Sequence, residues 1–139
     1  PCIFVMPEGK RGLNREVRHL VDLMPTFMEL AQVAGRETEG ISLLKEEGNR
    51  ELGWEHEGNR AYRKGKWKIV SEFPGTWTTM YPYEKKGAWE LYDMERDRSE
   101  LRDLASAMPE KVKELVGDYE VWARRIGVVE WSQLRGRKE

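Results

Sequence analysis

A short segment in the middle of the chain has the pattern of a β-hairpin, and this pattern limits the fold more than any other feature. Two runs rich in aromatic and basic residues, 60–64 and 67–71, are separated by a two-residue turn that begins at Gly65. Two strand-like runs joined in this way are a strong hairpin signal. Trp67 and Ile69 fall on one face, because side chains alternate along a strand. The sequence therefore predicts an antiparallel sheet with an apolar face that another element must cover.

A polar stretch, EHEGNR at 55–60, stands directly before this hairpin and lies between Trp54 and Trp67. We expect it to form a loop, and loops held by a rigid sheet often present functional groups. A further strand is expected at 89–92, because the sequence WELY has the alternation of a strand. The polar stretch is therefore the first place to look for a site.

The clearest helix is expected at residues 109–126. Pro109 suits the first helical position, and Gly127 suits the residue that ends a helix. Residues 128–131 are expected to fold back as a final short strand or an extended covering segment. Apolar residues recur along one helix face at the spacing of an amphipathic helix that covers a sheet: Val112, Leu115, Val116, Tyr119, Trp122, Ala123 and Ile126. The pattern predicts an α+β fold in which a small antiparallel sheet is covered by this long C-terminal helix.

The first part of the chain has weaker signals. Residues 2–6 are apolar and end at Pro7, which suits a strand buried on both faces within an α/β sheet. A short strand is expected at 16–21. A helix then begins at Asp22 and is closed by Gly35. This part therefore has the order strand, loop, helix.

A linker is expected between the two parts. Residues 36–53 are charged, contain several glycines and have little periodicity. We place the boundary near residue 45, which divides the chain into residues 1–45 and 46–139.

Composition and charge exclude several classes of function. The chain has 24 basic and 25 acidic residues, a balance that argues against a nucleic-acid partner. It has no apolar run near the roughly 18 residues needed to cross a bilayer, so no membrane partner is expected. Its single cysteine, Cys2, cannot form an internal disulfide, and its two histidines lie far apart in the sequence.

Two longer motifs resemble a known family. The segments GWEHEGNRAYRKGKWKIV and WELYDMERDRSEL, in this order and spacing, resemble the C-terminal portion of arylsulfatases, in the alkaline-phosphatase-like superfamily. The segment HLVDLMPTFMELAQVAG agrees as well, so the resemblance covers nearly the whole chain. It implies that residues 1–45 are a strand–helix segment from the end of the large α/β sulfatase domain. Residues 46–139 would then be the C-terminal subdomain of sheet and helix.

The resemblance implies a parent enzyme that hydrolyses sulfate esters with a formylglycine nucleophile and calcium. Cys2 is followed by Ile3-Phe4-Val5-Met6 and does not match the motif that is converted to formylglycine. We therefore carry over no catalytic or metal-binding residue, and we expect this chain alone to be inactive. The chain opens with proline, and we interpret it as a fragment or processed product. Its expected partner is the N-terminal sulfatase domain, and the substrate of the intact enzyme is a sulfate ester.

One site is implied by the resemblance, because the EHEGNR stretch faces the mouth of the cleft in related enzymes. His56 is then a candidate substrate-binding residue, with Glu57, Asn59 and Arg60 as weaker candidates. An imidazole and a guanidinium could hold an anionic ester or a sugar hydroxyl. The other interpretation is a structural loop in which the side chains of His56 and Asn59 cap the backbone. The sequence leaves both open.

A different class of function is also open. The loop at 73–83 is rich in aromatic residues, including Trp77, Tyr81 and Tyr83, which either cover the sheet or form a binding wall. The alternative is therefore a free-standing α+β module that binds a protein through this loop. We also expect self-association of the chain, either through the unpaired edge of the strand at 2–6 or through the exposed domain face.

Overall fold

The computed structural model describes residues 3–5, 12–33, 35, 37–46, 48–73 and 87–135. The chain forms two compact units, Pro1–Gly48 and Asn49–Glu139. The domain boundary expected near residue 45 remains a prediction.

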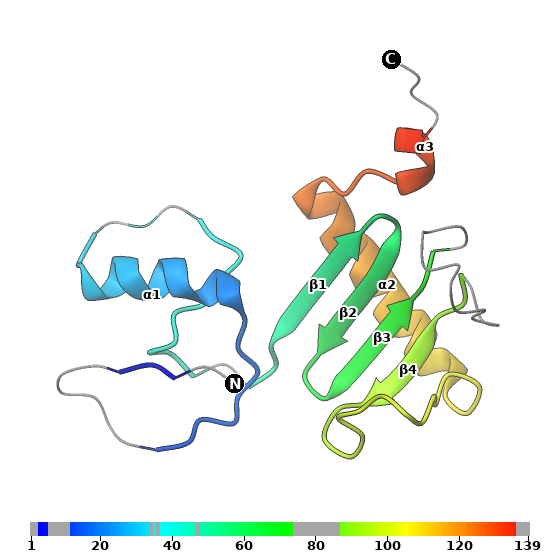
Figure 1. Cartoon of the computed structure of the whole chain (residues 1–139), viewed down its shortest axis with the longest axis horizontal. Helices are drawn as coiled ribbons and strands as arrows, with labels where there is room; N and C mark the ends of the chain where they lie inside the picture. Colours follow the sequence, from blue (N-terminus) through cyan, green and yellow to red (C-terminus); the bar gives the residue numbers. More distant parts are fainter. Residues whose placement is uncertain are drawn as a thin grey trace. The chain divides into compact units, whose positions relative to one another are not determined.

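The second unit contains a four-stranded antiparallel sheet (Figure 1). Its strands follow one another in the order β1-β2-β3-β4 without a crossover. The predicted hairpin is confirmed, because β2 and β3 pair through the turn at Gly65. The strand bounds are β1 (Glu51–His56), β2 (Asn59–Lys64), β3 (Trp67–Ser71) and β4 (Glu90–Asp93).

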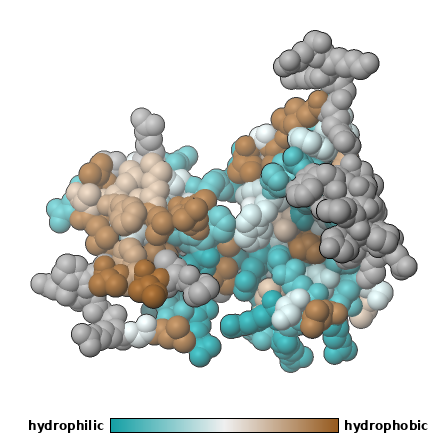
Figure 2. All heavy atoms as spheres, in the orientation of Figure 1, coloured by the Kyte–Doolittle hydropathy of each residue, from teal (hydrophilic) through white to brown (hydrophobic). Residues whose placement is uncertain are grey.

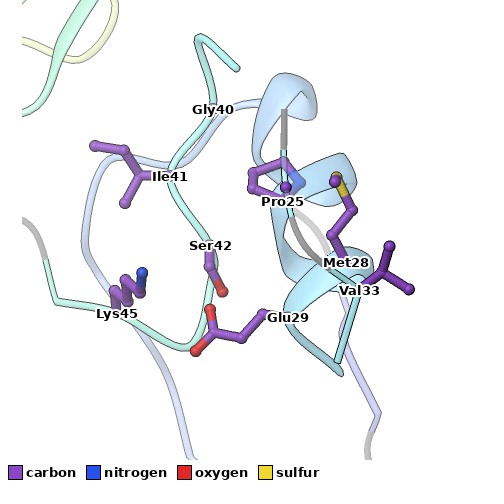
Figure 3. A pocket seen from close by; sticks show the side chains of 9 residues that line it. Pro25, Met28, Glu29, Val33, Gly40, Ile41, Ser42 and Lys45 are labelled. Carbon is purple, nitrogen blue, oxygen red and sulfur yellow. The ribbon is translucent and has the colours of Figure 1, made fainter. Parts of the chain in front are cut away.

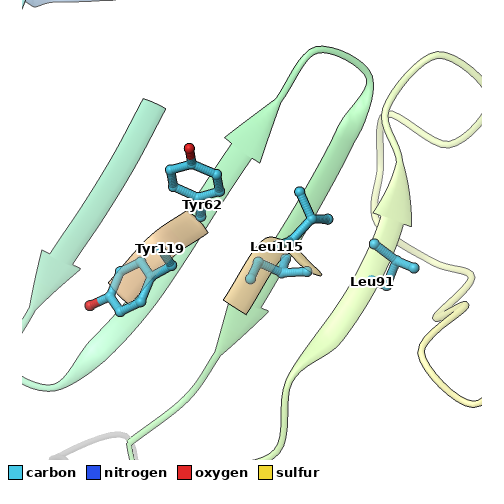
Figure 4. Close-up of a cluster of buried hydrophobic side chains, with 5 residues drawn as sticks. Tyr62, Leu91, Leu115 and Tyr119 are labelled. Carbon is cyan, nitrogen blue, oxygen red and sulfur yellow. The ribbon is translucent and has the colours of Figure 1, made fainter. Parts of the chain in front are cut away.

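A long helix, α2 (Pro109–Ile126), covers one face of this sheet, as the apolar periodicity predicts (Figure 1). Gly127 ends it in the left-handed conformation, with φ 78°. Ile126 is 41% exposed, so the apolar face that is buried is shorter than expected. Sheet and helix together bury a core made of Tyr62, Ile69, Leu91, Leu115 and Tyr119 (Figure 4). The predicted α+β class, a small antiparallel sheet under a long C-terminal helix, is confirmed.

The helix contacts β1 through an aromatic ring that lies on a glycine. A Cβ atom at Gly53 would lie 2.3 Å from the ring of Trp122. An ion-pair bridge ties the same elements together, because Lys64 Nζ lies 3.2 Å from Glu51 on β1 and 2.9 Å from Asp118 on α2. The close approach of α2 to β1 thus depends on the missing side chain at Gly53.

The first unit contains a 3₁₀ turn, η1 (Leu20–Asp22), which leads into the short helix α1 (Leu23–Leu30). The strand predictions for residues 2–6 and 16–21 are wrong at the residues that the structure describes. Residues 16–19 are irregular and residues 3–5 form no strand, since among the described residues no neighbouring strand pairs with them. The helix ends at Leu30 rather than near Gly35, because Gln32 adopts a left-handed conformation with φ 53°.

Three expectations for the second unit also need correction. The linker was predicted to extend to residue 53, but β1 already begins at Glu51. The expected loop at 55–60 is instead the end of β1, a two-residue turn and the start of β2. The expected extended segment at 128–131 gives way to a short helix, α3 (Trp131–Arg135). No helix in the described parts of the chain is long and apolar enough to cross a membrane.

A matched pair of glycine substitutions tests the contact between helix and sheet. Gly53→Ala should destabilise the protein by about 1–3 kcal/mol, because the new methyl group overlaps the Trp122 ring. Gly117→Ala in α2 should stabilise it by about 0.5–1 kcal/mol, because a Cβ there meets nothing within 4 Å and alanine favours a helix. Urea unfolding followed by tryptophan fluorescence measures both. A Gly53→Ala variant as stable as the wild type would contradict this packing.

Candidate functional site

The turn between β1 and β2 lies within the predicted site and has a tightly defined backbone. Glu57 and Gly58 both have positive φ, 53° and 85°, as in the two-residue turns that suit hairpins. The Gly58 N–H donates to Oε1 of Glu55 at 2.7 Å. A Cβ at Gly58 would lie 2.5 Å from the Phe73 ring. Glycine is therefore required here both for the backbone conformation and for the approach of Phe73.

Asn59 connects this turn to the chain after β3. Its Nδ2 donates to the carbonyl of His56 at 3.0 Å, and its Oδ1 accepts from the N–H of Phe73 at 3.0 Å. Both ends of the amide thus bond to backbone groups. This arrangement fits the structural interpretation of Asn59.

Arg60 is held on the helix-covered side of the sheet. Its guanidinium carbon lies 4.7 Å from the centre of the Trp89 ring, and Nη2 donates to Oγ of Ser71 at 3.3 Å. The Trp89 ring in turn packs edge-on against Tyr119, with ring centres 5.3 Å apart. A cation on an aromatic face gains about 0.5–2 kcal/mol, depending on how far water is excluded. The guanidinium is therefore fixed in place by the core beneath it.

The same core perturbs the tyrosines. Burial raises the pKa of Tyr119 to about 12, and the nearby positive charge of Arg60 opposes this shift. Burial also raises the pKa of Tyr62 well above its ordinary value, with the Glu51 carboxylate acting in the same direction. Both phenols are thus neutral at physiological pH. Both side chains belong to the buried core.

A pocket of about 250 Å³ lies beside Arg60, where β3 ends and β4 begins. Within it Glu90 is 5% exposed, and its Oε2 accepts from the Tyr92 hydroxyl at 2.6 Å. Because side chains alternate along a strand, Arg60 and Ser71 point to the helix-covered face of the sheet, and Val70 and Glu90 point to the other face. The polar groups at this pocket therefore come from both faces of the sheet. The described lining of the pocket is Asn59, Arg60, Val70, Ser71, Glu72, Ala88 and Glu90.

The four predicted site residues separate into two pairs. Asn59 and Arg60 line the pocket, whereas His56 and Glu57 are not among its described lining residues. His56 lies at the exposed end of β1. The sequence reasoning missed Ser71 and Glu90. The pairing of Arg60 with Ser71 across the hairpin could have indicated the first, because the turn at Gly65 fixes that register.

No metal site is offered by the described residues. Among them no group of three or more histidine, cysteine, aspartate or glutamate side chains could hold a metal ion. We therefore derive no chemical step through calcium from this chain.

The comparisons with known proteins point to sulfatases. No family model matches the sequence. An uncharacterized sulfatase of Schizosaccharomyces pombe (strain 972) is 31% identical over 136 residues, covering 84% of this chain and 23% of that protein. The chain is thus homologous to part of a sulfatase. It spans about a quarter of the length of this relative.

Two solved structures share the fold. One, from work on the metabolism of multiple glycosaminoglycans by Bacteroides thetaiotaomicron, has a TM-score of 0.53 at 20% identity and covers 72% of this chain and 24% of that chain. Another was solved in complex with its substrate, D-glucosamine-2-N,6-O-disulfate. It has a TM-score of 0.50 at 18% identity and covers 81% of this chain and 24% of that chain. At these identities the likeness supports the fold alone.

Substitutions at the two ends of the turn between β1 and β2 test which side chain stabilises the fold. Asn59 bonds to the backbone, whereas His56 is exposed. Asn59→Ala should lower the free energy of unfolding by about 1–3 kcal/mol, because the Phe73 N–H loses its acceptor. His56→Ala should change it by no more than about 0.5 kcal/mol, because the side chain is exposed. Denaturant unfolding of both variants is the measurement. Equal costs at the two positions would refute the assignment.

Proposed function

We propose that this chain is the C-terminal portion of an arylsulfatase-type sulfuric ester hydrolase, in which it shapes the rim of the catalytic cleft. The observation that carries the proposal is the 31% identity over 136 residues to a sulfatase of which the chain covers 23%. The sheet-and-helix fold supports it, because solved structures share that fold with a similar partial coverage. We likewise propose, for the intact enzyme, the hydrolysis of sulfate esters.

In this proposal the chemistry belongs to a preceding N-terminal domain, which supplies the formylglycine nucleophile and the calcium ion. The contribution of this chain is binding. Arg60, whose guanidinium lies on the Trp89 ring, offers a positively charged group beside a small pocket. His56 is exposed at the hairpin end and available to a bound ester. Such groups orient a substrate without taking part in bond breaking.

The alternative is a free-standing module that binds a protein through the aromatic loop at 73–83. Residues 74–83 of that loop lie outside the described residues. Sequencing the gene upstream of Pro1 distinguishes the two functions. The sulfatase is favoured if several hundred codons precede Pro1 and include a cysteine in a formylglycine-type motif. A reading frame that starts at Pro1 favours the module.

The chain by itself should show no sulfatase activity. We expect no turnover of an aryl sulfate such as 4-nitrophenyl sulfate, and no tight calcium binding in a calorimetric titration. The physical reason is that a reaction of this type needs an activated nucleophile, and Cys2, the single cysteine of this sequence, does not match the motif that is converted to formylglycine. Turnover by the purified 139-residue chain would refute the proposal.

In the full-length enzyme, His56 should affect substrate binding more than the chemical step. His56→Ala should raise KM by about 10–150-fold, the loss of one hydrogen bond to a charged group, with kcat changed little. Val121→Ala is the matched control, because Val121 is an exposed residue of α2. An unchanged KM for His56→Ala would contradict the proposal that His56 binds the substrate.

A further inference from the structure

The first unit offers little to an anionic ester. Figure 2 shows hydrophobic side chains gathered over this unit, where Phe27 is 55% exposed. A pocket of about 450 Å³ lies in it between α1 and the segment 40–45, and the walls of this pocket are mostly apolar (Figure 3). Its two charged side chains, Glu29 and Lys45, carry opposite charges, so they give a sulfate group no net attraction. The exposed end of the β1–β2 hairpin, where His56 stands, suits such a group better.

His56 and Asn59 are cross-strand neighbours at that end. They face each other in the β1–β2 ladder, and Glu55 and Arg60 form the next pair. Because side chains alternate along a strand, His56 and Asn59 share the face of the sheet turned away from α2, whereas Glu55 and Arg60 share the helix-covered face. Facing side chains on one side of a sheet have Cβ atoms about 4.5–5.5 Å apart. The Asn59 amide therefore stands beside the imidazole of His56.

The Asn59 amide bonds to two different segments of the chain. Its Nδ2 donates to the carbonyl of His56, and its Oδ1 accepts from the N–H of Phe73, 14 positions further along the sequence. The Phe73 ring also contacts the turn, because a Cβ at Gly58 would lie 2.5 Å from it. The backbone of His56 is thus tied through Asn59 to the chain that follows β3.

The backbone beside Phe73 is itself fixed to the sheet. Strand β3 ends just before it at Ser71, which pairs with Arg60 on β2. The Glu72 carbonyl accepts from the N–H of Gly87 at 2.7 Å, shortly before β4 begins. A functional side chain is held more precisely when its support belongs to a rigid element. Asn59 therefore joins the end of the hairpin to a rigid part of the fold.

We propose that Asn59 is a positioning residue for His56. Bonded at once to the His56 carbonyl and the Phe73 N–H, it holds the end of the hairpin, and with it the imidazole, in the geometry that meets the sulfate ester. The proposal rests on the proposed function, in which His56 contacts the substrate. Fixing a binding group in advance lowers the ordering cost of association. In this role Asn59 acts through His56 and makes no bond to the substrate itself.

The first test measures backbone order in the 139-residue chain by ¹⁵N relaxation. Asn59→Asp keeps the acceptor for the Phe73 N–H but loses the donor to the His56 carbonyl, whereas Asn59→Ala loses both. The order parameter of the His56 amide should be about 0.85 in the wild type and fall to about 0.6 or below in both variants. That of the Phe73 amide should fall only in Asn59→Ala.

A matched control makes the same chemical change at the other end of the hairpin. Asn49 is exposed, and its Oδ1 would lie 2.9 Å from a Cβ at Gly65 in the β2–β3 turn. Asn49→Asp should leave the order parameters of His56 and Phe73 at their wild-type values. Far-UV circular dichroism checks that each variant is folded. If Asn59→Ala does not fold, Asn59→Asp still decides the result, because it keeps the Phe73 bond.

The second test is a double-mutant cycle in the full-length enzyme with 4-nitrophenyl sulfate. Asn59→Ala, which adds no charge, should raise KM by at least about 5-fold and change kcat little. The double variant His56→Ala/Asn59→Ala should have the KM of His56→Ala alone, because a positioning residue has no effect once the group that it positions is gone. Two independent effects would instead multiply.

The outcomes separate this inference from the proposed function. An unchanged order parameter at His56 in Asn59→Asp overturns the inference, and so does a double variant whose KM effect is the product of the two single effects. A full-length enzyme without turnover, together with loss of order at His56, refutes the sulfatase function and supports the tie through Asn59. Turnover with unchanged order at His56 supports the function and refutes the positioning role.

Discussion

The packing of α2 on the sheet is the interaction on which the structure depends. Burial of Leu115 against Ile69 and Leu91 contributes on the order of 2 kcal/mol for each side chain. The ring of Trp122 lies on Gly53, which brings the helix close to the first strand. The same core supports Trp89, and Trp89 supports the guanidinium of Arg60. The guanidinium of Arg60 is therefore positioned by the hydrophobic core as well as by its hydrogen bond to Ser71.

The two units achieve order in different ways. The second unit buries an aromatic and aliphatic core, as a small independent domain does. The first unit is fixed by hydrogen bonds around Asp22 and Thr26, while Phe27 and Leu30 remain exposed. Hydrogen bonds give geometry but little net stability, since water competes for the same groups. Among the described residues, the first unit therefore has less buried apolar surface to stabilise it than the second.

The sequence predicted most of the fold where several local signals agreed. The helix at 109–126 has a proline start, a glycine end and one apolar face, and the structure reproduces its bounds. The strand β1 was missed because its helix-facing residues are Glu51, Gly53 and Glu55 rather than large apolar ones. Gly53 is small because Trp122 occupies the space of its side chain, a fact of tertiary packing. No pattern within the strand itself reveals it.

The candidate site was predictable only in part, for the same reason. The hairpin residues Asn59 and Arg60 stand out by their position, but Glu90 joins them only through the pairing of β3 with β4. The central claim is that the core between the sheet and α2, and not the hydrogen bonds of the first unit, carries most of the stability of the chain. Native-state hydrogen exchange of the isolated chain tests it most directly. Amides of β2 and β3 should exchange only through global unfolding, whereas amides of α1 should exchange at nearly unprotected rates. Equal protection of α1 and the sheet would contradict the account.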